Sequence, residues 1–92
     1  MPKYTSDIVA GYTLYFTSKC VIEAMHVHAS DRALTEDKSA KLFVYENGDT
    51  KIERYGQVND RDMKKIQHYI KNNYVQMYHK WCQYSDNGFY KN

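Results

Sequence analysis

The chain has 92 residues, which is enough for one domain and too few for two. Hydrophobic residues make up 42% of the chain and aromatic residues 15%, so a core of this size must depend on large aromatic side chains, most of them tyrosine. The net charge of +2 is too small to identify a nucleic-acid-binding protein, and no apolar run reaches the roughly 20 residues that cross a bilayer.

The charges are unevenly distributed along the chain. Residues 1–60 carry seven basic and nine acidic side chains, whereas residues 61–92 carry six basic and two acidic ones. The last third of the chain is therefore the part that can present a basic surface. The chain starts without a secretory signal pattern, so we expect a cytoplasmic protein in which Cys20 and Cys82 stay reduced.

The first half of the chain predicts strands. We expect residues 1–9 to form a loose segment, followed by a sheet region over residues 10–55. Residues 12–17 predict a first strand because they are rich in aromatic and β-branched side chains. Residues 25–29 predict a second strand, whose side chains alternate between two faces. Residues 30–39 are polar and charged, and they predict an exposed loop.

The clearest local pattern is Asn47-Gly48, which stands between two runs of strand-forming residues and predicts a hairpin. Two registers stay open. A two-residue turn places Phe43 opposite Ile52, whereas a three-residue loop with a left-handed Gly48 places Leu42 opposite Ile52. The choice matters because a slip of one residue reverses which face of the strand is buried.

Residues 59–84 predict one long helix with Asn59 as its N-cap. Its apolar residues recur at spacings of three and four, in the order Met63, Ile66, Ile70, Tyr74, Met77, Trp81 and Tyr84. At 1.5 Å per residue such a helix is about 37 Å long, which exceeds the length of a small sheet. It therefore either kinks at Asn72-Asn73 or presents part of its apolar stripe to a partner.

Residues 85–92 predict a polar C-terminal tail, in which Phe89 and Tyr90 are placed to fold back onto the helix. Residues 1–92 are thus expected to form a single α+β domain. In this domain we expect a small, mainly antiparallel sheet of three or four strands that packs on one long C-terminal helix.

His26 and His28 form the most suggestive short motif. Two histidines at i and i+2 on a strand project to the same face, where both imidazoles can bind one divalent metal ion. Further ligands would have to come from elsewhere in the chain, and the candidates by residue type are Cys20, Asp31, His68, His79 and Cys82. No second ligand pair occurs at a fixed spacing, which favours the alternative that both histidines hydrogen-bond to their neighbours.

Five basic residues of the predicted helix are candidates for nucleic-acid contacts: Arg61, Lys64, Lys65, Lys71 and Lys80. Basic and aromatic side chains together suit phosphate pairing and base stacking. These residues are scattered around the helix rather than gathered in one line, and that favours an ordinary solvated surface.

Other chemistries leave no recognisable pattern. The four glycines are far apart, so there is no glycine-rich phosphate loop, and neither a Cys-x-x-Cys pair nor a His-Glu-x-x-His helix occurs. His79 and Cys82 are three residues apart on the helix, but no oxyanion donor accompanies them. Cys82 is expected to lie half-buried beside the apolar stripe. We assign no catalytic residue and no cofactor beyond the metal considered at the two histidines.

Three function hypotheses follow. The first is a non-enzymatic module that binds another small protein, or a second copy of itself, through one helix surface. That surface is expected to consist of Tyr69, Tyr74, Met77, Tyr78 and Trp81, because Tyr, Met and Trp are enriched at interfaces. The second is a metal-dependent hydrolase or nuclease built on His26 and His28. The third is a nucleic-acid-binding regulator that uses the basic helix.

An aromatic strand over residues 12–16, the His26-Val27-His28 strand, the Asn47-Gly48 turn and a helix over residues 59–81 follow one another in this order. This order, over residues 10–83, resembles a bacterial family, the domain of unknown function numbered 4160. Its members usually carry two prolines before the first histidine, where this chain has Ala24 and Met25. The resemblance implies a small α+β fold in the prokaryotic cytoplasm, toxin–antitoxin-like gene arrangements and no accepted activity.

Overall fold

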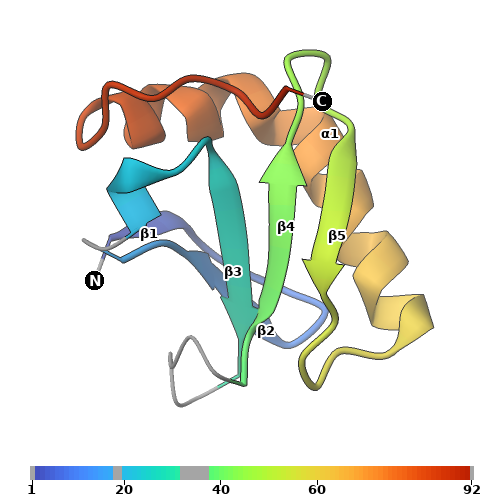
Figure 1. The fold of residues 1–92 in the computed structure, drawn as a ribbon. Helices are drawn as coiled ribbons and strands as arrows, with labels where there is room; N and C mark the ends of the chain where they lie inside the picture. Colours follow the sequence, from blue (N-terminus) through green and yellow to red (C-terminus); the bar gives the residue numbers. More distant parts are fainter. Residues whose placement is uncertain (1, 18–19, 32–37, 92) are drawn as a thin grey trace.

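In the computed structural model, which describes residues 2–17, 20–31 and 38–91, one antiparallel sheet packs against one long helix (Figure 1). The elements are β1 (Lys3–Val9), β2 (Tyr12–Tyr15), the 3-10 helix η1 (Cys20–Ile22), β3 (His26–Ser30), β4 (Ala40–Val44), β5 (Thr50–Arg54) and α1 (Asp60–Cys82). The strands follow one another across the sheet in chain order. The predicted α+β class is confirmed, but the described residues form a sheet of five strands rather than three or four. Residues 32–37 of the predicted loop lie outside the described residues.

β1 is the main departure from the expectation. Residues 3–9, expected to be loose, form a strand that pairs with β2. Most of its side chains are polar and only Tyr4 and Val9 are buried, so the sequence lacks the alternation of a half-buried strand. The turn into β2 holds Ala10 at φ 54° and Gly11 at φ 87°. This left-handed pair is typical of a two-residue hairpin turn, but alanine seldom adopts it, so the sequence did not indicate the turn.

β3 runs through the middle of the sheet, and all of its side chains are buried. They alternate as predicted. Val27 and Ala29 belong to the core cluster, whereas His26 and His28 project to the opposite face of the sheet. The alternation therefore identified which residues share a face, but it did not indicate that the histidine face is also buried.

The β4–β5 hairpin adopts the second of the two open registers. Leu42 lies opposite Ile52. Gly48 has φ 89°, and its N–H donates to the Tyr45 carbonyl at 2.9 Å, while the Tyr45 N–H donates to the Asp49 carbonyl at 2.8 Å. The left-handed glycine at the third loop position thus sets which strand face is buried.

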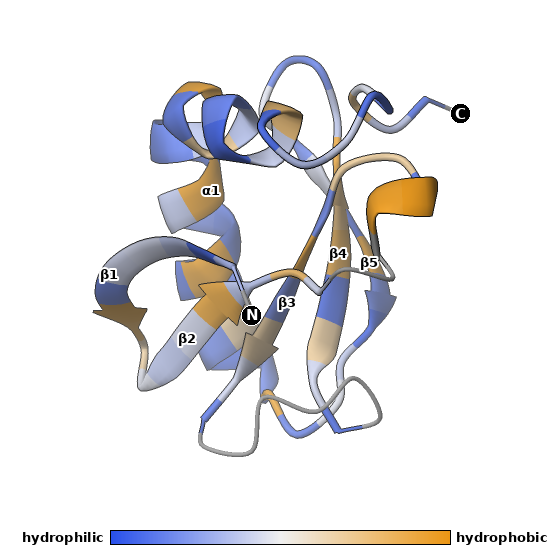
Figure 2. Ribbon diagram, turned by 90° about the vertical axis from the view of Figure 1, so that its left-hand side faces the viewer, coloured by the Kyte–Doolittle hydropathy of each residue, from blue (hydrophilic) through white to orange (hydrophobic). Residues whose placement is uncertain are grey.

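Helix α1 begins where the N-cap was predicted, since the Asn59 side chain accepts a hydrogen bond from the Asp62 N–H at 2.8 Å. The helix bends in its middle, as both views show (Figures 1 and 2). The Asn73 side-chain amide donates to the Tyr69 carbonyl at 2.8 Å and so competes with the backbone of the helix, which is a known cause of bending. No helix in the described parts of the chain is long and apolar enough to span a membrane.

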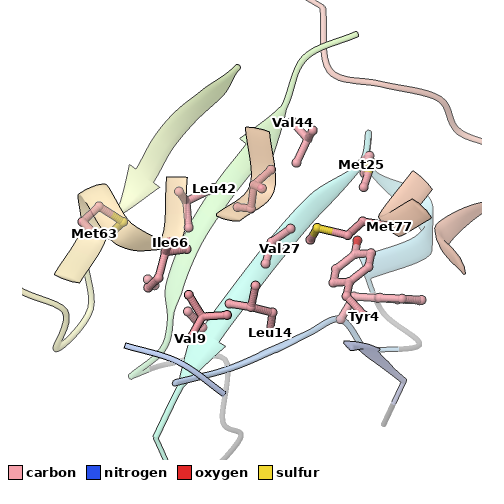
Figure 3. Packing of buried hydrophobic residues seen from close by; sticks show 14 of the residues in the cluster. Tyr4, Val9, Leu14, Met25, Val27, Leu42, Val44, Met63, Ile66 and Met77 are labelled. Atoms are coloured by element: carbon pink, nitrogen blue, oxygen red, sulfur yellow. The ribbon is translucent and has the colours of Figure 1, made fainter. Parts of the chain in front are cut away.

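The core lies between α1 and one face of the sheet. Figure 3 shows Leu14, Val27 and Leu42 of the strands facing Ile66 and Met77 of the helix. The predicted helix stripe supplies five fully buried side chains, which are Met63, Ile66, Ile70, Met77 and Trp81. Its last member, Tyr84, is exposed instead, because it lies beyond the end of α1.

The C-terminal tail crosses from the end of α1 to the sheet. The Trp81 indole N–H donates to the Asn87 carbonyl at 2.7 Å, and Phe89 stacks on a helix tyrosine, Tyr78, at 3.8 Å between ring centroids. Tyr90 then reaches β4, where its N–H donates to the Val44 carbonyl at 2.8 Å. The predicted fold-back onto the helix is confirmed for Phe89, whereas Tyr90 pairs with the sheet instead.

Candidate functional site

The two histidines of β3 are enclosed by the protein. Their exposed fractions are 0% for His26 and 3% for His28, and their ring centroids are 5.1 Å apart. His26 Nδ1 lies 2.9 Å from the Ala24 carbonyl oxygen, and His28 Nδ1 lies 3.0 Å from Ser39 Oγ. Both rings are therefore held by neighbouring groups, as the hydrogen-bonding alternative for this motif expects.

Aromatic rings and one ion pair surround these histidines. His26 packs edge-on against Phe43 at 5.5 Å between ring centroids, and His28 stacks on Tyr15 at the same separation. At the rim, Glu23 Oε2 lies 3.9 Å from His26 Nε2 and 3.1 Å from the Lys41 ammonium nitrogen. The sequence did not indicate this enclosure, because it depends on strands and tail segments that meet only in the folded chain.

The metal-ligand candidates do not come together. Within the described residues, no group of three or more His, Cys, Asp and Glu side chains is arranged to hold a metal ion. His68, His79 and Cys82 lie on α1, whereas the two histidines lie on β3. The side chain of Cys20 lies outside the described residues. A metal-dependent hydrolase or nuclease at His26 and His28 therefore gains no support from the described part of the chain.

Cys82 is exposed, which corrects the expectation that it is half-buried. It follows Tyr78 by one turn of the helix, and hydrogen bonding between the two side chains raises the pKa of the Tyr78 phenol. The buried stripe runs through Met77 and Trp81, and Cys82 lies about 100° around the helix from Trp81. Helical spacing alone was too coarse to distinguish half-burial from exposure at this position.

The predicted interaction surface on α1 does not form a free surface. Met77 and Trp81 are core residues, with exposed fractions of 2% and 0%. Tyr69 donates its hydroxyl to Asp7 of β1 at 3.0 Å. The two remaining members, Tyr74 and Tyr78, both contact Phe89 of the tail. This chain itself therefore encloses Met77 and Trp81, whereas Tyr69, Tyr74 and Tyr78 make internal contacts but keep partly exposed side chains.

A groove lies between the β4–β5 hairpin and the first half of α1. The hairpin lines it with Tyr45, Asn47, Gly48, Asp49 and Thr50, and the helix lines it with Lys64, Gln67, His68 and Lys71. Lys64, His68 and Lys71 share one helix face because they stand at i, i+4 and i+7. The Gln67 side chain donates to Thr50 Oγ1 at 2.9 Å and ties the helix to β5. We refer to this feature as the hairpin–helix groove.

The hairpin–helix groove carries more positive than negative charge. The Lys71 ammonium lies 2.9 Å from Asp49 Oδ1 and 2.9 Å from the Asn47 carbonyl oxygen. The hydrogen bond from Lys71, reinforced by one from Asn47, lowers the pKa of the Asp49 carboxyl below its ordinary value. Lys64 has no ion-pair partner among the described residues, and it is exposed. One lysine of the groove thus holds a carboxylate, while the other is available to a ligand.

The remaining basic candidates lie outside the groove. Arg61 approaches Asp62 at 3.7 Å, and the Lys80 ammonium lies over the Tyr84 ring at 5.8 Å from its centroid. Lys65 is exposed and does not line the groove. The structure therefore brings together only Lys64 and Lys71 of the five predicted contacts. Their spacing indicated one helix face, but it carried no information about the hairpin that faces them.

β5 is the last strand of the sheet in the described part of the chain, so one of its edges is open (Figure 1). Thr50 of this strand lines the groove. The Tyr45 N–H donates to the Asp49 carbonyl, so Phe43 and Lys51 form the next hydrogen-bonded pair of the antiparallel ladder. By the same alternation, the backbone N–H and C=O groups of Thr50 and Ile52 point away from β4, toward the open edge. An edge of this kind is a template for a further strand.

Comparison with known proteins identifies a family and no individual relative. No curated protein and no solved structure matches the chain. Residues 11–82, from the turn before β2 to the end of α1, match a family model described as "Domain of unknown function (DUF4160)". β1 and the C-terminal tail lie outside that match. The chain therefore belongs to the DUF4160 family.

Proposed function

We propose that the protein is a non-enzymatic binding module, which takes up an extended segment of a partner protein along the open edge of β5. The observation that carries this proposal is the outward direction of the Thr50 and Ile52 backbone groups beside the hairpin–helix groove. An added strand satisfies these groups with main-chain hydrogen bonds, and the groove supplies contacts to its side chains.

The two edges of the sheet differ in their suitability for this role. The pairing of β1 with β2 is irregular between Lys3 and Ile8, and a bulge of this kind discourages the addition of another strand. β5 pairs regularly with β4 over residues 50–52, and its irregularity comes only at the Arg54 end. Thr50, the first residue of this regular part, also lines the groove. These features favour β5 as the binding edge.

The test uses short peptides selected from a random display library on the immobilised protein, followed by amide chemical-shift mapping. We expect the selected peptides to shift the amide signals of residues 50–54 and of the groove. The substitution Ile52→Pro removes an outward N–H without removing a ladder bond to β4, and it should weaken binding roughly tenfold or more.

The matched control for this test is Ile52→Ala, which loses the same side chain but keeps the N–H. It should retain most of the affinity, and the dispersion of amide signals shows whether each variant is folded. Equal binding by the folded Ile52→Pro variant, or shifts confined to another surface, contradicts the proposal.

A further inference from the structure

Building on the proposed function, we infer that the bound segment is acidic, with carboxylates that bind Lys64 and Lys71 in the hairpin–helix groove. The inference names the chemistry of the partner, which the open edge of β5 alone does not specify. It depends on the charges of the groove, on the spacing of the two lysines and on the carboxylate that already occupies part of the site.

Asp49 shows that this groove accepts a carboxylate. Its Oδ1 atom lies 2.9 Å from the Lys71 ammonium nitrogen, which is the distance of a charge-assisted hydrogen bond. Both side chains are about half exposed, at 49% for Lys71 and 60% for Asp49, so solvent and a ligand reach the pair. An incoming carboxylate can therefore share Lys71 with Asp49 or replace it.

Lys64 supplies the second charge. It lies two helical turns before Lys71, which corresponds to about 10.5 Å along the axis, and His68 stands between them. In an extended segment, side chains on the same face are about 7 Å apart at i and i+2. The flexible lysine side chains cover the difference, so acidic residues at alternate positions of the segment reach both ammonium groups.

The same groove is less suited to a nucleic acid. A phosphate backbone needs an extended run of positive charge, and the lysines that could extend the positive surface beyond Lys64 and Lys71, namely Lys65 and Lys80, lie outside the groove. The open edge of β5 offers peptide-like N–H and C=O groups, and the aromatic residue that lines the groove, Tyr45, already packs against Tyr90 at 5.4 Å between ring centroids. An acidic peptide therefore fits both the charges and the backbone groups of the site.

The test compares a short peptide that has glutamate at alternate positions with the same peptide carrying glutamine at those positions. Binding to the full chain is measured by fluorescence anisotropy at low and high salt. We expect the glutamate peptide to bind about five- to tenfold more tightly at low salt, and high salt to remove most of this difference.

Three substitutions connect the effect to the groove. Lys64→Gln should weaken binding of the glutamate peptide several-fold and leave the glutamine peptide unaffected. Asp49→Asn should strengthen binding of the glutamate peptide, because it removes the competing charge and keeps the shape of the side chain. Lys65→Gln removes a neighbouring exposed lysine outside the groove, and it should leave affinity unchanged.

The outcomes separate this inference from the proposed function. If both peptides bind equally and Ile52→Pro abolishes both, the β5 edge is the binding site and the acidic preference is wrong. If Lys64→Gln and Lys65→Gln have the same effect, the groove is not the charged site. A single-stranded oligonucleotide that binds more tightly than the glutamate peptide, with loss in Lys64→Gln, assigns the groove to nucleic acid and overturns the inference. If neither peptide binds, both proposals fail.

Discussion

The two hairpins at the edges of the sheet reverse the chain with nearly the same glycine conformation, yet they stand in different surroundings. Gly11 has φ 87° and Gly48 has φ 89°. A Cβ atom added at Gly11 meets no described atom within 4 Å, whereas one added at Gly48 lies 2.5 Å from Cδ1 of Tyr74. Gly11 is thus needed only for its positive φ angle. Gly48 is needed for its positive φ angle and also because a side chain there would overlap Tyr74 of the helix.

This difference bears on the groove. The β4–β5 loop is held against α1 at Tyr74, at the Lys71–Asp49 ion pair and at the Gln67–Thr50 hydrogen bond. A binding site between two elements needs such a fixed separation. If the loop were loose, ordering it on binding would cost free energy and would lower the affinity for a ligand. The β1–β2 turn has no comparable attachment at its glycine among the described residues, and it does not line the hairpin–helix groove.

The largest effect is expected for Gly48→Ala. A left-handed alanine costs about 1–2 kcal/mol, and the overlap with the Tyr74 ring adds about 1–3 kcal/mol, so the free energy of unfolding should fall by about 2–5 kcal/mol. Urea unfolding of the variant and of the unmodified chain measures the difference.

Tyr74 provides the control for that substitution. In a Tyr74→Ala background the overlap disappears, so Gly48→Ala should then cost only the backbone part. A cost that stays the same in both backgrounds means that the ring contact plays no part, and the contrast between the two turns is lost.

A smaller effect is expected for Gly11→Ala, at about 1–2 kcal/mol, because only the left-handed backbone is strained at this exposed position. The same urea experiment measures it. A cost as large as that of Gly48→Ala in the unmodified chain contradicts the view that the two glycines answer different requirements.

The same contrast explains what the sequence predicted. Asn47-Gly48 is a strong turn pattern, and it located the hairpin but left two registers open until the conformation of Gly48 was known. Ala10-Gly11 is a weak pattern because alanine rarely takes a positive φ, and for this reason β1 was taken for a loose segment. A turn could therefore be predicted from the sequence only where its residue types favour the backbone conformation that they adopt.

The candidate site was less predictable than the fold. Alternation placed His26 and His28 on one face, but their burial depends on rings contributed by distant segments, such as Tyr15 and Phe43. Helical spacing likewise placed Lys64 and Lys71 on one face, whereas the loop opposite them is positioned by tertiary packing. Helical spacing also located five buried residues of the apolar stripe, but it did not indicate that the C-terminal tail packs against part of the same helix.

A stabilising effect is expected for Ala10→Asn in the first turn. Asparagine adopts the left-handed conformation more readily than alanine, and Asn-Gly is the preferred pair for a two-residue hairpin turn. The free energy of unfolding should rise by about 0.5–1 kcal/mol. Urea unfolding measures this change. If Ala10→Asn destabilises the chain, the left-handed description of the β1–β2 turn is wrong, and the contrast between the two turns is lost.

The smallest effect concerns the Lys71–Asp49 ion pair of the second hairpin. Lys71 and Asn47 lower the pKa of Asp49 in the folded chain, so the carboxylate contributes stability above the ordinary aspartate pKa and loses that contribution as the pH falls through the lowered value. A carboxyl-carbon NMR titration should show the Asp49 pKa rising toward the ordinary value in Lys71→Gln. It should show no change in Lys65→Gln, whose substituted side chain lies outside the groove.

Because the pair is exposed, the accompanying change in stability is small, and the titration is the sensitive measurement. An Asp49 pKa that does not respond to Lys71→Gln means that the ion pair does not hold the loop to the helix, and the attachment then depends on Tyr74 and Gln67.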